Sequence, residues 1–78
     1  MRIYRVIRLG SKPDMWSGVK ARTPRDAIKK VYKDHDVYIR SCEKEECTHR
    51  VELMYSKKEH VSCYDVKVLG IKEKILHR

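Results

Sequence analysis

Asn, Gln and Phe are absent from the sequence, and only three Gly and two Pro occur among its 78 residues. The lack of thermolabile amides, together with 38% charged residues, is typical of hyperthermophile proteins and predicts a thermophilic source. Long apolar runs are also absent, because Arg5 and Arg8 interrupt the apolar residues near the start. We therefore expect neither a membrane span nor a secretory signal, and we expect a cytoplasmic protein.

Catalytic motifs are missing as well. The chain has no Gly-rich phosphate loop, no G-x-S-x-G segment and no paired carboxylates in an apolar setting. His60 and Cys63 could be taken as a nucleophile pair, but an activated thiolate needs a pocket that so short a chain has little length to build. We therefore expect a protein that is not an enzyme and that needs no cofactor.

The length predicts a single domain over residues 1–78. A hydrophobic core of this size is close to the lower limit for independent stability, and chains below about 80 residues often gain stability by oligomerising. A homodimer formed through an edge strand would be one such solution.

Positive charge is abundant and unevenly distributed. The formal net charge is +8. Residues 1–40 contain eleven Lys or Arg and four acids, whereas residues 41–78 contain eight and seven. This asymmetry indicates a polyanionic partner, because Lys and Arg bind phosphates with release of counterions, although it can also serve solubility alone.

The pattern of apolar residues predicts both strands and a helix. Five strands are expected over residues 2–9, 15–22, 37–41, 48–55 and 61–69, and a helix over residues 23–36. Thr23 suits the N-cap, Pro24 the first helical position and Asp26 the first turn. One helix face would carry Pro24, Ala27, Ile28, Val31, Tyr32 and His35, and the other Arg25, Lys29, Lys30 and Lys33. The predicted fold is α+β, a two-layer ββαβββ arrangement with one helix packed on a largely antiparallel sheet.

Cys42 and Cys47 flank four charged residues, and they could belong to a zinc site, to a disulfide loop or to the polar tip of a hairpin. The register of the last hairpin decides whether Cys63 could join a zinc site. Pairing Tyr55 with His60 is favoured, because it places apolar residues opposite apolar ones. In that register Cys63 lies about 17 Å along the strand from Cys47, too far to share one metal ion.

The hairpin between residues 37–41 and 48–55 bears on the disulfide. Its apolar pattern favours pairing Ile39 with Val51, which places the two flanking cysteines on opposite faces of the sheet. We therefore expect ordinary cysteines and no bound metal at this tip, and a disulfide or a metal site is the alternative.

The sheet surface turned away from the helix is the candidate functional site. If the helix covers Ile3, Ile7, Val19, Ile39 and Val51, the opposite surface carries Arg2, Tyr4, Arg8, Trp16, Lys20, Arg22, Tyr38 and Arg40. Aromatic rings interleaved with cations are typical of platforms for single-stranded nucleic acid, where bases stack on the rings and phosphates meet Lys or Arg. Arg25, Lys29 and Lys33 of the helix would add a sequence-independent contact. We therefore predict binding of RNA or single-stranded DNA, the alternative being an ordinary solvated sheet face.

A protein-interaction module is the alternative function. Met15, Trp16, Tyr38 and Met54 could form an apolar contact patch for a small regulator or inhibitor, with the charge serving solubility. Salt separates these two classes, because high salt releases nucleic acid and leaves an apolar contact intact.

A family resemblance bears on the same question. The segments MRIYRV, then Trp16, VKARTPRDAIKKVY and YIRS together resemble the small archaeal ribosomal protein of the LX type, which is related to a eukaryotic large-subunit protein. The resemblance covers residues 1–41, and residues 42–78 lie outside it. It implies a ββαβ unit that contacts ribosomal RNA.

Overall fold

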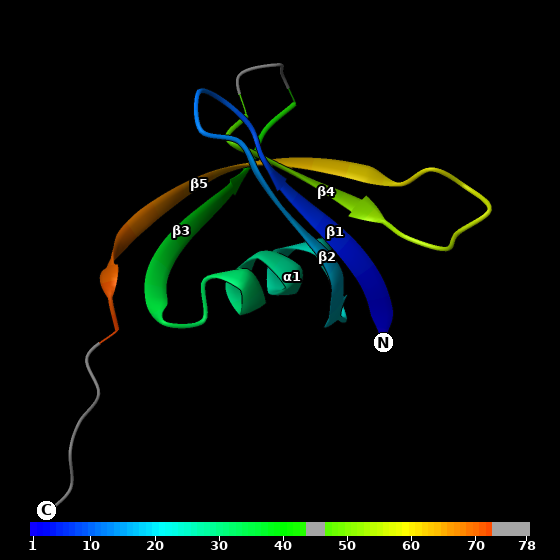
Figure 1. The fold of residues 1–78 in the computed structure, drawn as a ribbon, viewed down its shortest axis with the longest axis horizontal. Coiled ribbons are helices and arrows are strands. Elements are labelled where there is room, and N and C mark those ends of the chain that lie inside the picture. The colour runs from blue at the N-terminus through cyan, green and yellow to red at the C-terminus, as the bar shows by residue number, and fades with distance from the viewer. Residues whose placement is uncertain (44–46, 73–78) are drawn as a thin grey trace, which may run out of the picture.

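The structure is a computed structural model that describes residues 1–43 and 47–72. It is a small α+β fold with one helix and a five-stranded antiparallel sheet (Figure 1). The elements along the chain are β1 (Arg2–Arg8), β2 (Asp14–Ala21), α1 (Pro24–Val31), β3 (His35–Ser41), β4 (His49–Leu53) and β5 (Val61–Ile71). The predicted α+β class, with one helix on an antiparallel sheet, is confirmed. Within the described ranges, no helix has the length and apolar character needed to cross a membrane.

The strand order in the sheet is β2-β1-β4-β5-β3, so β2 and β3 are its edge strands. The sheet curves around α1, which lies on its concave side between β3 and the β1–β2 hairpin (Figure 1). β5 pairs with β4 along one edge and with β3 along the other. The hairpin predicted between β3 and β4 is therefore wrong, because β5 lies between these two strands.

The helix begins where the sequence predicts and ends earlier. The Thr23 hydroxyl accepts a hydrogen bond from the Asp26 backbone N–H at 3.1 Å, and Pro24 opens the first turn. The predicted helix continued to residue 36, but Tyr32 caps it and His35 already begins β3. Residues from His35 onward form a strand and not a helix, because β3 pairs with β5 from its first residue to its last.

The core lies between α1 and the concave face of the sheet. Its buried residues are Tyr4, Val6, Ala21, Ala27, Ile28, Val51 and Tyr64. The prediction that Ile3 and Ile7 face the helix is therefore wrong, since side chains alternate along a strand and Tyr4 occupies the helix side. Arg5 supplies the physical reason: between these two isoleucines it would be buried without a partner, whereas on the open face it lies 3.4 Å from Glu52.

A β-bulge in β2 brings two large side chains to the core side. Tyr4 pairs with Val19 but Val6 pairs with Trp16, so β2 has one extra residue in this interval. Gly18 lies in the bulge with a left-handed φ of 70°. A regular strand would place Trp16 and Val19 on opposite faces because their separation is odd, and the bulge allows both to pack against the core.

The pairing of β4 with β5 is two residues away from the predicted register. Arg50 lies opposite Cys63, and the Leu53 N–H donates to the His60 carbonyl at 3.0 Å. The turn is longer than predicted because Tyr55, with a left-handed φ of 58°, belongs to the turn and not to the ladder. An even shift keeps every side chain on its predicted face, but it moves Cys63 toward the start of β4.

Candidate functional site

Ion pairs occupy the open face of the sheet, the face turned away from α1. Arg5 Nη1 lies 3.4 Å from Glu52 Oε1, and Arg50 Nε lies 3.5 Å from Glu52 Oε2. On the other side of this face, Arg40 Nη2 donates to Asp65 Oδ2 at 3.0 Å. A cation that already has a carboxylate partner attracts a phosphate less strongly, so the open face is a poor nucleic-acid surface.

The predicted aromatic platform is not formed. Tyr38 does lie on the open face and is 59% exposed, but Tyr4 is 3% exposed and belongs to the core. Trp16 packs on the helix side of the sheet, where its ring makes an edge-to-face contact with Tyr32 at 5.8 Å between centroids. The prediction that Tyr4, Trp16 and Tyr38 share one exposed surface is therefore wrong.

The four apolar residues of the alternative contact patch are also dispersed. Met15 lies on edge strand β2, whereas Tyr38 lies on β3, the edge strand at the opposite side of the sheet. Trp16 faces the core side, as described above. These residues do not form the contiguous apolar area that a protein-binding patch requires.

Arg25, one of the predicted nucleic-acid contacts, is used inside the fold. Its Nη1 donates to the Ile39 carbonyl at 3.0 Å, and its Nη2 donates to Ser41 Oγ at 2.9 Å. The same guanidinium lies 5.5 Å from the centroid of the Tyr64 ring. Arg25 therefore ties the start of α1 to β3 and β5.

A basic surface remains on the solvent side of α1, and it consists of Arg22, Lys29, Lys30 and Lys33. All four side chains are exposed. Three of them line a shallow hollow of about 300 Å³: Arg22, Lys29 and Lys30, together with Met1, Ala21 and Asp26. Among the residues that the structure describes, none of the four cations lies within ion-pair distance of a carboxylate. The charges of Arg22, Lys29 and Lys33 are thus available to a ligand, whereas Lys30 also has a contact within the fold.

Local sequence explains why these cations gather there. Ala27 and Ile28 are buried against the sheet, so Lys29 falls on the opposite side of the helix and Lys30 on its flank. Lys30 Nζ also donates to the Lys20 carbonyl, which fixes the helix against edge strand β2. The Lys20 side chain itself projects from the open face of the sheet, opposite Ile3, and is outside the basic surface.

A polar network around the buried His49, which the sequence did not reveal, joins α1 to the sheet. Tyr32 Oη lies 2.6 Å from His49 Nε2, and His49 Nδ1 lies 2.9 Å from Thr48 Oγ1. Thr48 Oγ1 in turn donates to the Tyr64 carbonyl at 3.3 Å and accepts from the Val66 N–H at 2.7 Å. The only sequence signal was the position of His49 in an alternating strand, where it shares a face with apolar residues.

Burial shifts the pKa values of both titratable members of this network. Desolvation lowers the pKa of His49, and the nearby Arg8 guanidinium lowers it further. Desolvation raises the pKa of Tyr32, against an opposing effect of Arg8. Arg8, another predicted nucleic-acid contact, thus faces this network, and its Nε donates to the Lys12 carbonyl at 2.9 Å. His49 is only 3% exposed, so its imidazole joins parts of the fold and is out of reach of a substrate.

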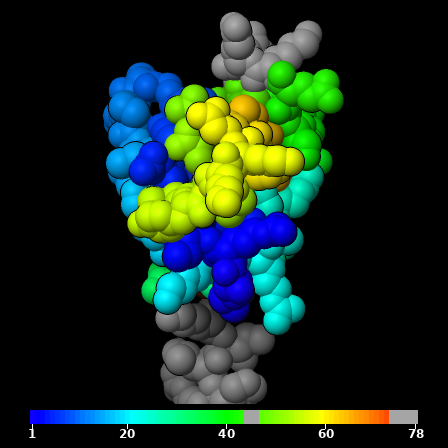
Figure 2. Space-filling model, turned by 90° about the vertical axis from the view of Figure 1, so that its right-hand side faces the viewer, coloured from blue at the N-terminus to red at the C-terminus, as the bar shows by residue number. Residues whose placement is uncertain are grey.

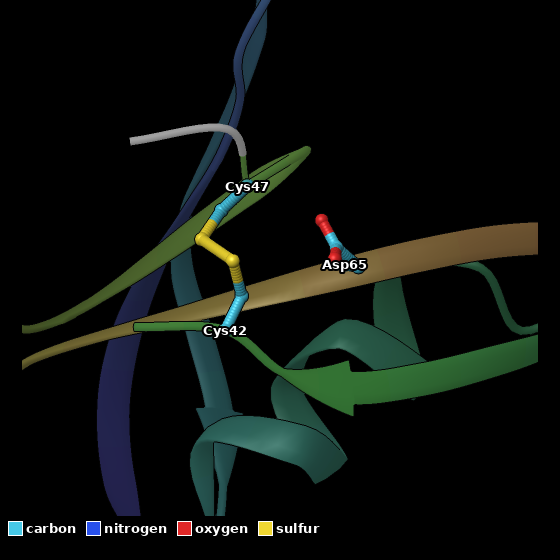
Figure 3. Close-up of side chains that lie close together, drawn as sticks. All are labelled: Cys42, Cys47 and Asp65. Carbon is cyan, nitrogen blue, oxygen red and sulfur yellow. A yellow bond between two sulfur atoms is a disulfide. The ribbon is translucent and has the colours of Figure 1, made fainter. Parts of the chain in front are cut away.

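The cysteines lie much closer together than predicted. Cys42 and Cys47 form a disulfide with 5.9 Å between their Cα atoms, so the expectation of two separate cysteines is wrong (Figure 3). The Cys42 N–H donates to the Cys63 carbonyl at 3.0 Å, which makes these residues cross-strand neighbours. The separation of about 17 Å predicted between Cys63 and Cys47 was derived from a β4–β5 register that is wrong by two residues.

No family model, no curated protein and no solved structure matches the chain. The fold and the surface described above therefore define this chain only as a small α+β protein with a basic helix.

Proposed function

We propose that the chain is a non-catalytic nucleic-acid-binding protein that holds RNA or single-stranded DNA on the basic surface of α1. The observation that carries the proposal is the set of four exposed cations, Arg22, Lys29, Lys30 and Lys33, which have no carboxylate partner among the described residues. Unpaired cations gain the most from a phosphate, because binding releases the counterions condensed on the nucleic acid.

The rigidity of α1 supports the same function. The helix is fixed at its start by the Thr23 cap and by Arg25, and at its end by the contact of Tyr32 with His49. Cations on a fixed helix lose less conformational freedom on binding than cations on a mobile segment. The sheet contributes no stacking platform in this proposal, so the contact is made to the phosphate backbone and is independent of sequence.

Two expectations from the sequence enter the proposal. The charge of residues 1–40 favours a polyanion, and the resemblance of residues 1–41 to the archaeal ribosomal protein LX type favours RNA within that class. A cytoplasmic location in a thermophile, where RNA is accessible, is part of the same proposal.

The test is titration of labelled mixed-sequence RNA and single-stranded DNA with the protein, followed by fluorescence anisotropy at several salt concentrations. The Lys29→Ala/Lys33→Ala variant should lower the salt slope of log K by about 1.4, or about 0.7 for each lost phosphate contact on a single strand. Trp16 fluorescence is unsuited to this measurement, because Trp16 packs on the core side of the sheet.

The matched control is Lys57→Ala/Lys58→Ala, which removes the same charge from the turn between β4 and β5. In Figure 2 this turn (yellow) lies above the N-terminal residues (blue), and part of the helix segment (cyan) lies below them. The control should keep the wild-type slope. Equal losses in the two variants would mean that binding follows net charge alone, and absence of binding at low salt would refute the function itself.

A further inference from the structure

Two cysteines and one aspartate cluster where β3, β5 and the segment before β4 meet, and a third cysteine lies on the strand beside them. The Cys42 and Cys47 sulfurs and a carboxylate oxygen of Asp65 all lie within 4.8 Å of one another (Figure 3). Cys63 is on the same sheet face as Asp65, two residues along β5, and its carbonyl accepts from the Cys42 N–H. Cys63 is a free, half-buried thiol.

This donor set has the composition of a zinc site. Zinc takes four ligands in a tetrahedron, with Zn–S distances of about 2.3 Å and Zn–O distances of about 2.0–2.2 Å. Ligands of such a tetrahedron lie less than about 4 Å apart, so the three groups within 4.8 Å need only small movements to reach it. Cys42 and Cys47 are five residues apart in sequence, but Asp65 is brought to them by the pairing of β3 with β5.

We propose that reduction of the Cys42–Cys47 disulfide turns this cluster into a zinc site with Cys42, Cys47 and Asp65 as ligands and Cys63 as the fourth. The disulfide takes up two electrons and two protons from a dithiol reductant, which is oxidised to its own disulfide. Zn²⁺ then displaces the thiol protons, because only thiolates bind the metal. A disulfide oxidant reverses the sequence: it accepts the two electrons and is reduced to its dithiol, the Cys42–Cys47 bond re-forms, and the ion is released.

The surroundings favour a charged metal centre. Arg40 Nη2 donates to Asp65 Oδ2 at 3.0 Å, which orients the carboxylate in the way that partners of metal ligands commonly do. Arg50 lies opposite Cys63 on the neighbouring strand β4. Three thiolates and one carboxylate exceed the charge of Zn²⁺ by two, and the Arg40 guanidinium beside Asp65 offsets part of that excess.

The experiment uses the whole chain, with and without a phosphine reductant, and CoCl₂ as a spectroscopic probe that ZnCl₂ then displaces. The reduced protein should bind one Co²⁺ per chain with the absorption of tetrahedral thiolate coordination, and the oxidised protein should bind none. Asp65→Asn and Cys63→Ser should each weaken binding at least tenfold, whereas Asp36→Asn, on β3 away from the cysteines, should not.

Folding is followed by circular dichroism in each state, because metal binding and folding are coupled when a site lacks its ion. If the reduced protein unfolds without metal, ZnCl₂ should refold it. The Asp65→Asn variant should then need at least a tenfold higher ZnCl₂ concentration to refold. A reduced protein that binds neither Co²⁺ nor Zn²⁺ would overturn the proposal. Binding that is unchanged in both Asp65→Asn and Cys63→Ser would do the same, because it would reduce the site to two thiols.

Discussion

Tyr32 Oη lies 2.6 Å from His49 Nε2, so the residue that caps α1 is joined through the core to the first residue of β4. The consistent arrangement of protons has the Tyr32 hydroxyl donating to Nε2 and the His49 Nδ1–H donating to Thr48 Oγ1. His49 is neutral in this arrangement, in agreement with the lowering of its pKa by burial. This network makes stability sensitive to pH and to the loss of one hydroxyl.

The first prediction concerns acid. The folded state lowers the pKa of His49 below the value of about 6.5 found in an unfolded chain, so the unfolded chain binds more protons between these two values. The stabilisation is fully present above about pH 6.5 and is lost as the pH falls through the lowered pKa. Urea unfolding at a series of pH values should show this decrease in the wild type. His49→Gln should flatten the profile, whereas His60→Gln, at an exposed position, should leave it unchanged.

A second prediction concerns the Tyr32 hydroxyl. Tyr32→Phe keeps the ring contact with Trp16 but leaves the His49 Nε2 acceptor buried without a partner. The free energy of unfolding should fall by about 1–3 kcal/mol at neutral pH. Tyr38→Phe removes the hydroxyl of an exposed tyrosine and should change stability by less than about 0.5 kcal/mol. Equal effects of the two substitutions would show that the Tyr32–His49 bond does not contribute.

The β-bulge supplies a third prediction. Gly18 has a φ of 70°, and a Cβ added there would meet no atom within 4 Å. Gly18→Ala should therefore cost about 1–2 kcal/mol through backbone conformation alone, because L-residues are disfavoured in the left-handed region. Ser17→Ala, at the exposed neighbouring position, is the control and should be nearly neutral. Thermal unfolding of both variants measures this cost. Equal stability of Gly18→Ala and Ser17→Ala would contradict the prediction.

A fourth prediction distinguishes the structural role of Arg25 from the proposed binding role of Arg22. Arg25→Ala removes the hydrogen bonds to Ile39 and Ser41, and it should lower the free energy of unfolding by about 1 kcal/mol. Arg22→Ala should leave stability within about 0.5 kcal/mol and should instead reduce the salt slope of RNA binding by about 0.7. Stability and anisotropy measurements on both variants should thus give opposite patterns. If Arg22→Ala destabilised the fold and left binding intact, the assignment of the basic surface would be wrong.

Features that depend on residues close together in the chain could be predicted from the sequence. Thr23, Pro24 and Asp26 defined the start of the helix, because capping depends on residues within one turn. The alternation of apolar residues predicted strands on both sides of that helix, and hence the α+β class. The cations of the basic surface were also visible, because residues buried at 27 and 28 leave their neighbours exposed.

The positions of Tyr4, Trp16 and Cys63 were decided by the tertiary structure. Tyr4 faces the core because Arg5 has a carboxylate partner only on the open face, on a strand more than forty residues away in the chain. Trp16 faces the core because a bulge changes the alternation of β2. Cys63 approaches Cys42 because β5 lies between β4 and β3.

The sequence by itself therefore determined the helix start, the class of fold and the distribution of charge, all of which depend on composition or on neighbours in the chain. The tertiary structure alone decided which side of each strand is buried and which cysteines meet. The physical reason is that strand side chains alternate with a period of two, so a shift of one residue reverses both faces. That shift is decided by partners far away in the chain, which no local pattern specifies.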